Sequence, residues 1–144
     1  MVFDQQEFDV RCEWGEGGVA ALAPISDVVI IVDVLSFSTA VDIAVQRGAS
    51  VFPFRWKDDR AQAFADSMHA ELAHPTRAVG KYSLSPQSLV EIPPGTRIVL
   101  PSPNGATLTL AARPARVLAG CLRNARAAAT AAALLPQWAG AIAR

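Results

Sequence analysis

Cysteine, charge and long apolar runs are all scarce in this 144-residue chain. Cys12 and Cys121 are its two cysteines, and charged residues make up 18% of the sequence. Two distant thiols predict reduced cysteines rather than a disulfide framework. No apolar run approaches the roughly 20 residues of a membrane span, and the first residues lack the basic start of a signal peptide. We therefore expect a cytoplasmic protein with no membrane partner.

Common signatures of nucleotide- and metal-dependent enzymes are also missing. The sequence has no Walker loop, no Gly-x-Gly-x-x-Gly, no Gly-x-Ser-x-Gly and no histidine pair at metal spacing. His69 and His74 are therefore expected at the surface. The Cys-x5-Arg loop of cysteine phosphatases is absent, which makes Cys121 a candidate for a buried structural thiol. The arginines are not interleaved with stacking aromatics, so nucleic acid is not an expected partner.

Acidic residues are absent after Glu91, and this divides the chain by charge. Residues 1–91 contain all 13 acids and 7 of the 13 bases, a formal charge of −6, whereas residues 92–144 carry +6. A basic half suits an anionic ligand or an acidic partner surface, and it equally suits a solvated set of arginines. Hydrophobic residues make up 51% of the sequence, which excludes disorder and predicts one folded domain over residues 1–144.

The most informative stretch that is present runs from Val28 to Thr39. Its apolar start, rich in β-branched residues, predicts a strand buried on both faces, as in a parallel sheet covered by helices. Asp33 ends the apolar run, and Ser38 and Thr39 are expected to cap a helix that extends to about Arg47. In open α/β sheets, ligands bind at the carboxyl ends of strands, where helix N-termini favour phosphate.

Strands and helices are expected to alternate along the rest of the chain. Strands are predicted at 8–14, 50–54, 70–73, 97–100 and 116–119, and helices at 19–22, 60–68, 106–112 and 125–135. Such alternation indicates βαβ units, so we expect an α/β fold with three layers, α/β/α, and a mainly parallel sheet. The apolar ending of the sequence leads us to expect that a C-terminal part of this fold lies outside the chain.

Three segments between a strand and a helix carry candidate chemistry. They are Asp33 with its following hydroxyl residues, Ser102-Pro103-Asn104-Gly105, and Cys121-Leu122-Arg123-Asn124. Because the carboxyl ends of parallel strands share one edge, we expect Asp33, Asn104 and Asn124 to face a common cleft. Asp33 is the first candidate for a metal ligand and Asp27 the second. The alternative for Asp33 is a cap or an ion pair at the end of a strand.

Taken in order, these segments resemble a known family. The residues that carry the resemblance are Asp33 to Thr39, Ser85-Pro86, Pro103-Asn104-Gly105 and Arg123-Asn124, and the family is that of the 2-phosphosulfolactate phosphatases. The resemblance covers about residues 14–125. It implies a three-layer α/β fold and a Mg²⁺-dependent phosphatase that converts 2-phospho-3-sulfolactate to 3-sulfolactate and phosphate, a step toward coenzyme M in some organisms. Ser36-Phe37 and Lys81 depart from the family pattern, which tends to have Arg-Ala and an acid there.

Under this hypothesis the substrate is a small phosphorylated anion and Mg²⁺ is the cofactor. Asp33 holds the metal and Arg123 stabilises the transferring phosphoryl group. The phosphate-binding set is Ser36, Ser38, Thr39, Ser102, Asn104, Gly105 and Asn124. The alternative for these residues is capping and turn geometry, and for Arg123 an ordinary surface position. The rival function is a non-catalytic anion-binding or protein-interaction module on the same fold, and a homodimer is left open.

Overall fold

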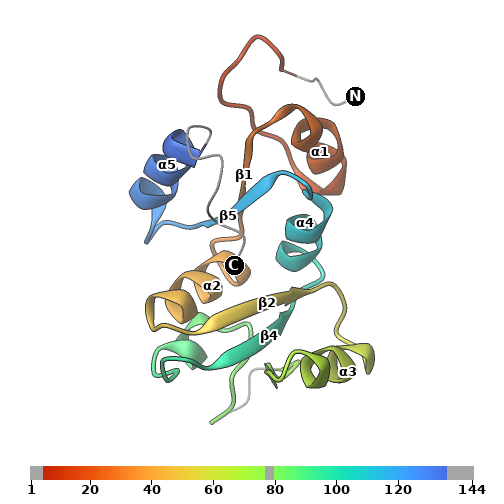
Figure 1. The fold of residues 1–144 in the computed structure, drawn as a ribbon, viewed down its shortest axis with the longest axis vertical. Coiled ribbons are helices and arrows are strands. Elements are labelled where there is room, and N and C mark those ends of the chain that lie inside the picture. The colour runs from red at the N-terminus through yellow and green to blue at the C-terminus, as the bar shows by residue number, and fades with distance from the viewer. Residues whose placement is uncertain (1–4, 77–79, 136–144) are drawn as a thin grey trace.

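The computed structural model describes residues 5–76 and 80–135 and confirms an α/β fold (Figure 1). The helices are α1 (Gly15–Leu22), α2 (Phe37–Gln46), α3 (Arg60–Ser67), α4 (Gly105–Ala111) and α5 (Ala125–Leu134), with short 3-10 turns at Ala23–Ile25 and Pro86–Leu89. The strands are β1 (Val28–Val32), β2 (Ser50–Phe54), β3 (Glu71–Leu72), β4 (Arg97–Pro101) and β5 (Arg116–Gly120). All pairings between these strands are parallel, as the alternation of strands and helices predicts.

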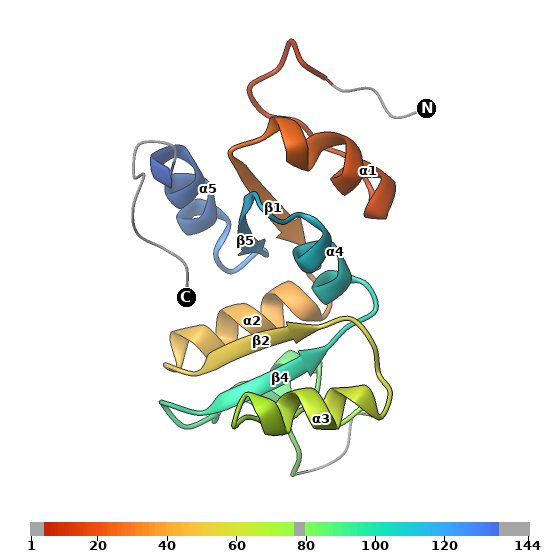
Figure 2. The same cartoon turned by 45° about the vertical axis from the view of Figure 1, so that its right-hand side comes forward.

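The strands of the described residues form two separate ladders. Strand β1 pairs with β5, with Val32 opposite Gly120, whereas β4 lies between β2 and β3. Helices α2 and α4 contact both ladders and lie between them (Figures 1 and 2). These two helices therefore join the ladders, and they set how the carboxyl ends of β1 and β4 face each other.

The core lies between α2 and the ladder of β2, β4 and β3. Ile98 and Leu100 of β4 are fully buried and belong to one apolar cluster with Phe37 and Ile43 of α2. Helix α3 contacts β3 and β4 and covers the outer face of this ladder (Figure 2). A ladder covered on both faces explains why its central strand β4 carries the most deeply buried side chains.

Strand β1 is less buried than its sequence predicts. Ile31 is only 4% exposed, but its neighbour Val32 is 68% exposed, so the prediction of burial on both faces is wrong. Helix α5 contacts this ladder, yet no residue in its span Ala125–Leu134, all of it described, is fully buried. A continuous apolar run shows that both faces of a strand tolerate burial, and it does not show how many layers cover them.

The predicted strand at 8–14 is also wrong. This stretch has irregular backbone, and α1 begins directly after it with the glycine-rich segment 15–18. Trp14 is 89% exposed and Val10 is similarly exposed. The alternation of apolar and polar residues matches a strand, but a strand needs a paired neighbour, and this segment has none within the described residues.

Other local predictions agree with the structure. Pro53 predicts an edge position or the end of a strand, and it lies on β2, at the edge of its ladder. Ser85 before Pro86 predicts a single helical turn, and a 3-10 turn starts at Pro86. Both cysteines are free, with Cys121 buried. Helix α2 begins at Phe37, so the predicted cap residues lie within its first turn instead. His69 is exposed and His74 is half-buried.

Helical spacing predicts that α2 buries Val41, Ala44 and Val45, but Val45 is exposed, and the buried residues of the helix include Ala40, Ile43 and Ala44. Among the described residues, no helix has the length and apolar character needed to cross a membrane.

The different burial of the two ladders gives a test with matched substitutions. Val99→Ala removes two methyl groups from a fully buried position on β4, so we expect the free energy of unfolding to fall by about 2 kcal/mol. Val32→Ala makes the same change on an exposed position of β1 and should cost less than about 0.5 kcal/mol. Urea unfolding of both variants measures the difference. Equal losses would show that β1 is as deeply buried as β4.

Candidate functional site

The loop between β1 and α2 is closed by the carboxylate of Asp33. Its Oδ1 accepts hydrogen bonds from the backbone N–H of Ser36 at 3.3 Å and from the Ser36 hydroxyl at 3.1 Å. Asp33 is half-buried, and a carboxylate offers about four acceptor positions. These hydrogen bonds therefore orient the carboxylate, and they leave some of its acceptor positions for a ligand.

The hydroxyls of Ser38 and Thr39 hold this loop against the helix. Ser38 Oγ donates to the carbonyl of Ile31 at 2.6 Å and accepts from the backbone N–H of Asp33 at 3.1 Å. Thr39 Oγ1 donates to the carbonyl of Val34 at 2.6 Å. Ser38 is fully buried, so its hydroxyl serves the loop rather than a ligand in solvent.

The loop between β4 and α4 has the same design. Ser102 is buried, and its Oγ accepts a hydrogen bond from the backbone N–H of Gly105 at 3.1 Å. Asn104, at the N-cap position of α4, is exposed. Of the residues predicted to bind phosphate in this loop, Asn104 is the one whose side chain is open to solvent.

The third loop, between β5 and α5, is closed by an asparagine. Asn124 Oδ1 accepts from the backbone N–H of Cys121 at 2.8 Å, and its Nδ2 donates to the carbonyl of Ala119 at 3.0 Å. Both hydrogen-bonding ends of this amide are therefore engaged within its own loop. Such side-chain closure is typical of asparagine at the start of a helix.

Arg123 in the same loop is bound to α2. Its Nε lies 3.0 Å from Oδ2 of Asp42, and its Nη2 donates to Oε1 of Gln46 at 3.2 Å. The Asp42 side chain is only 6% exposed, so removal of its cationic partner would be costly. This geometry assigns Arg123 a structural contact that links the third loop to α2.

The first loop is adjacent to the other two, and we call residues 33–36, 102–104 and 121–124 the three-loop site. The pairing of Val32 with Gly120 places the first loop beside the third. A methyl group at Gly105 would lie 2.5 Å from Cβ of Phe37, so the starts of α2 and α4 are in contact. The first loop is therefore adjacent to the other two, but its proximity to the second arises from helix packing because β4 and β1 belong to different ladders. A common cleft faced by Asp33, Asn104 and Asn124 stays a prediction.

The metal chemistry available at this site is limited. No group of three or more His, Cys, Asp or Glu side chains suited to a metal exists among the described residues. Asp27 precedes β1 and so lies at the opposite end of the strand from Asp33, about 20 Å away along an extended chain. Asp27 cannot share a metal with Asp33. Because Mg²⁺ binds through one or two carboxylates plus water and phosphate, Asp33 fits a Mg²⁺ ion held jointly with a phosphate ligand.

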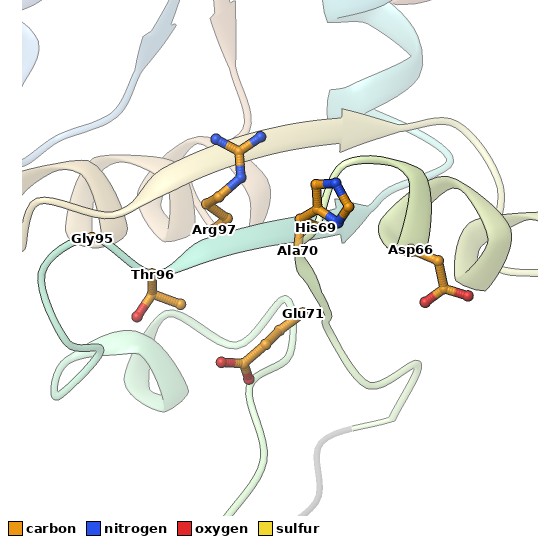
Figure 3. A pocket seen from close by; sticks show the side chains of 7 residues that line it. All are labelled: Asp66, His69, Ala70, Glu71, Gly95, Thr96 and Arg97. Carbon is orange, nitrogen blue, oxygen red and sulfur yellow. The ribbon is translucent and has the colours of Figure 1, made fainter.

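A separate hollow of about 480 Å³ lies at the opposite end of β4 (Figure 3). Its lining residues are Asp66, His69, Ala70, Glu71, Gly95, Thr96 and Arg97. Figure 3 shows that the side chains of Asp66, Glu71 and Arg97 point in different directions rather than toward one centre. Because the polar side chains of this hollow do not converge on one point, it lacks the geometry of a binding site. We therefore place the candidate functional site at the three loops.

Sequence reasoning missed two arginine-related features. The contact between Arg123 and Asp42 joins residues 81 positions apart, and no local pattern signals it. Arg55 follows directly after β2 and is half-buried, which places a cation at the carboxyl end of a strand. The sequence does contain a signal for Arg55, because this polar residue directly follows a predicted strand, as Asp33 does.

Comparison with known proteins identifies no relative: no family model, curated protein or solved structure matches the chain. The resemblance to the 2-phosphosulfolactate phosphatases therefore remains a hypothesis from the sequence. The function has to be argued from the geometry of the three-loop site.

The contact between the starts of α2 and α4 predicts an unusual response to a glycine substitution. Alanine normally stabilises a helix relative to glycine, by up to about 1 kcal/mol, and Gly17→Ala in α1, which meets open space, should follow this rule. Gly105→Ala should instead destabilise the protein by about 1–3 kcal/mol because the methyl group meets Phe37. Thermal unfolding measures both. Stabilisation by Gly105→Ala would contradict the contact and the convergence of the loops.

A double-mutant cycle tests the structural role of Arg123. We expect Arg123→Ala and Asp42→Asn to show a coupling free energy of about 1 kcal/mol in denaturant unfolding, because each residue is the partner of the other. Arg126→Ala, an exposed arginine of α5, combined with Asp42→Asn should show none. Additive losses from Arg123→Ala and Asp42→Asn would leave Arg123 available for a ligand.

Proposed function

We propose that this chain binds a small phosphorylated anion together with Mg²⁺ at the three-loop site and hydrolyses its phosphomonoester bond. The observation that carries the proposal is the half-buried Asp33 carboxylate, oriented by Ser36 at the carboxyl end of β1. The exposed Asn104 lies on a loop whose helix packs against the same region. The resemblance of these segments to 2-phosphosulfolactate phosphatases adds 2-phospho-3-sulfolactate as the specific candidate substrate.

The chain's own residues divide the work of such a site. Asp33 provides a fixed negative group for the metal, and Ser36 sets its orientation. When bound, Mg²⁺ supplies polarisation of a phosphoryl oxygen and neutralises developing charge. The Asn104 amide is available to donate a hydrogen bond to a phosphate oxygen, and the N-terminal end of α2 adds a positive dipole. Because Ser38 and Thr39 already hold the loop, the ligand meets a site that needs little rearrangement.

A non-catalytic anion-binding module is the second candidate. It is favoured by one observation, the engagement of Arg123 with Asp42 and Gln46. With that guanidinium occupied, the site retains groups that bind a phosphate and lacks the cation assigned to stabilising its transfer. The two candidates differ in a single measurable property, since both bind phosphate and only the enzyme turns it over.

Substitution of Asp33 tests the proposal. Asp33→Asn keeps the shape of the side chain and removes its charge, so Mg²⁺-dependent hydrolysis of 2-phospho-3-sulfolactate should fall by roughly 100-fold or more. Asp27→Asn makes the same change at the exposed opposite end of β1 and should leave turnover unchanged. Phosphate release is measured with and without Mg²⁺, with p-nitrophenyl phosphate as a general substrate.

The possible outcomes separate the two candidates. Turnover that survives Asp33→Asn would remove Asp33 from the reaction. Binding of phosphate with Mg²⁺ by the unaltered protein, without any release of phosphate from either ester, would establish the binding module and reject the phosphatase.

A further inference from the structure

Three arginines of the described residues are half-buried: Arg11, Arg55 and Arg116. Arg11 donates to two backbone carbonyls, and Arg116 donates to the carbonyl of Leu135. Arg55 differs, since it makes no hydrogen bond or ion pair with the part of the chain that the structure describes. None of the described buried side-chain nitrogens or oxygens lacks a partner, so the guanidinium nitrogens of Arg55 are open to solvent, and a guanidinium has five donors and is always charged. The donors of Arg55 are therefore accessible to an anion that the described part of the chain does not supply.

The register of the β2–β4 pairing places Arg55 at the β4–α4 loop. Phe54 is opposite Pro101, and the backbone N–H of Ser102 donates to the carbonyl of Phe54 at 2.9 Å, which continues the pairing past the strands. Arg55 is thus level with Ser102. By the alternation of side chains it falls on the same side of the ladder as Val51, which packs against the core cluster that includes α2.

Asp58, the first acidic residue after Arg55 in the sequence, already has a cationic partner. Asp58 forms an ion pair with Arg60 at 2.6 Å, and this hydrogen bond lowers the pKa of the Asp58 carboxyl. The guanidinium of Arg60 lies over the ring of Trp56, 3.9 Å from its centroid. This arrangement keeps Asp58 with Arg60 and leaves the charge of Arg55 unneutralised beside the three-loop site.

We infer that Arg55 is an anion-binding residue of the three-loop site and contacts an oxyanion group, phosphate or carboxylate, of the ligand. The planar guanidinium binds two oxygens of such a group at once, and an exposed Asn104 amide on the neighbouring loop adds a further donor. The inference rests on the proposed function for the location of the ligand and not for its chemistry. Arg55 takes the place of Arg123 as the cation that recognises the ligand.

Calorimetric titration of the full chain, in the presence of Mg²⁺, tests this inference without requiring turnover. The probe is 2-phosphoglycolate, which carries a phosphate and a carboxylate. Arg55→Gln should weaken its binding by about 10- to 100-fold, the effect of losing charged hydrogen bonds. Arg47→Gln removes an exposed arginine at the C-terminal end of α2 and should leave affinity unchanged. Arg55→Lys keeps the charge without the planar fork and should give an intermediate affinity.

Two simpler ligands identify the group that Arg55 contacts. A loss shared by 2-phosphoglycolate and ethyl phosphate assigns the phosphate, and a loss confined to 2-phosphoglycolate assigns the carboxylate. Equal affinity of the unaltered protein and both Arg55 variants, or no binding by the unaltered protein, overturns the inference. If Arg55→Gln does not unfold cooperatively, the lysine variant decides. Arg55-dependent binding without hydrolysis would leave this inference standing and reject the phosphatase alone.

Discussion

The packing of α2 between two ladders is the interaction on which the rest of the structure depends. Phe37 and Ile43 join the core on β4, and Phe37 also meets Gly105 at the start of α4. A single helix therefore fixes both the main hydrophobic core and the distance between loops that belong to different ladders. No strand pairing among the described residues connects the two ladders. The burial of apolar side chains of α2 therefore holds the loops of the candidate site next to one another.

At the carboxyl ends of the strands, the need to satisfy backbone groups competes with ligand binding. Ser38, Ser102 and Asn124 each use a polar side chain to bond backbone N–H or C=O groups of the turn from strand to helix. The residue types that close such turns are the same types that bind phosphate. Solvent exposure separates the two roles here, and it leaves Asn104 with the carboxylate of Asp33 for a ligand.

The sequence predicted local structure better than it predicted which distant segments contact one another. The edge position of β2 and the start of α5 follow from Pro53 and Asn124, whose backbone preferences act locally. The division into two ladders and the Arg123–Asp42 contact depend on segments far apart in the chain, and composition does not encode which segments meet. The stretch ending at Trp14 failed for the same reason, since strand-like alternation was present and a pairing strand was not.

The shallow packing of α5 has a consequence for the dynamics of the protein. No residue of its span Ala125–Leu134 is fully buried, and hydrogen bonds hold its two ends: Arg123 to Asp42, Asn124 to the preceding loop, and Arg116 to the carbonyl of Leu135. An element held by few apolar contacts opens at a low free energy, well below global unfolding. Amide hydrogen exchange in α5 should therefore be faster than in β4, and salt, which screens the partly exposed Arg123 contact, should increase that difference. The third loop is thus held to α2 by the Arg123 contact, while the first two loops adjoin helices whose residues Phe37 and Ala106 belong to the core.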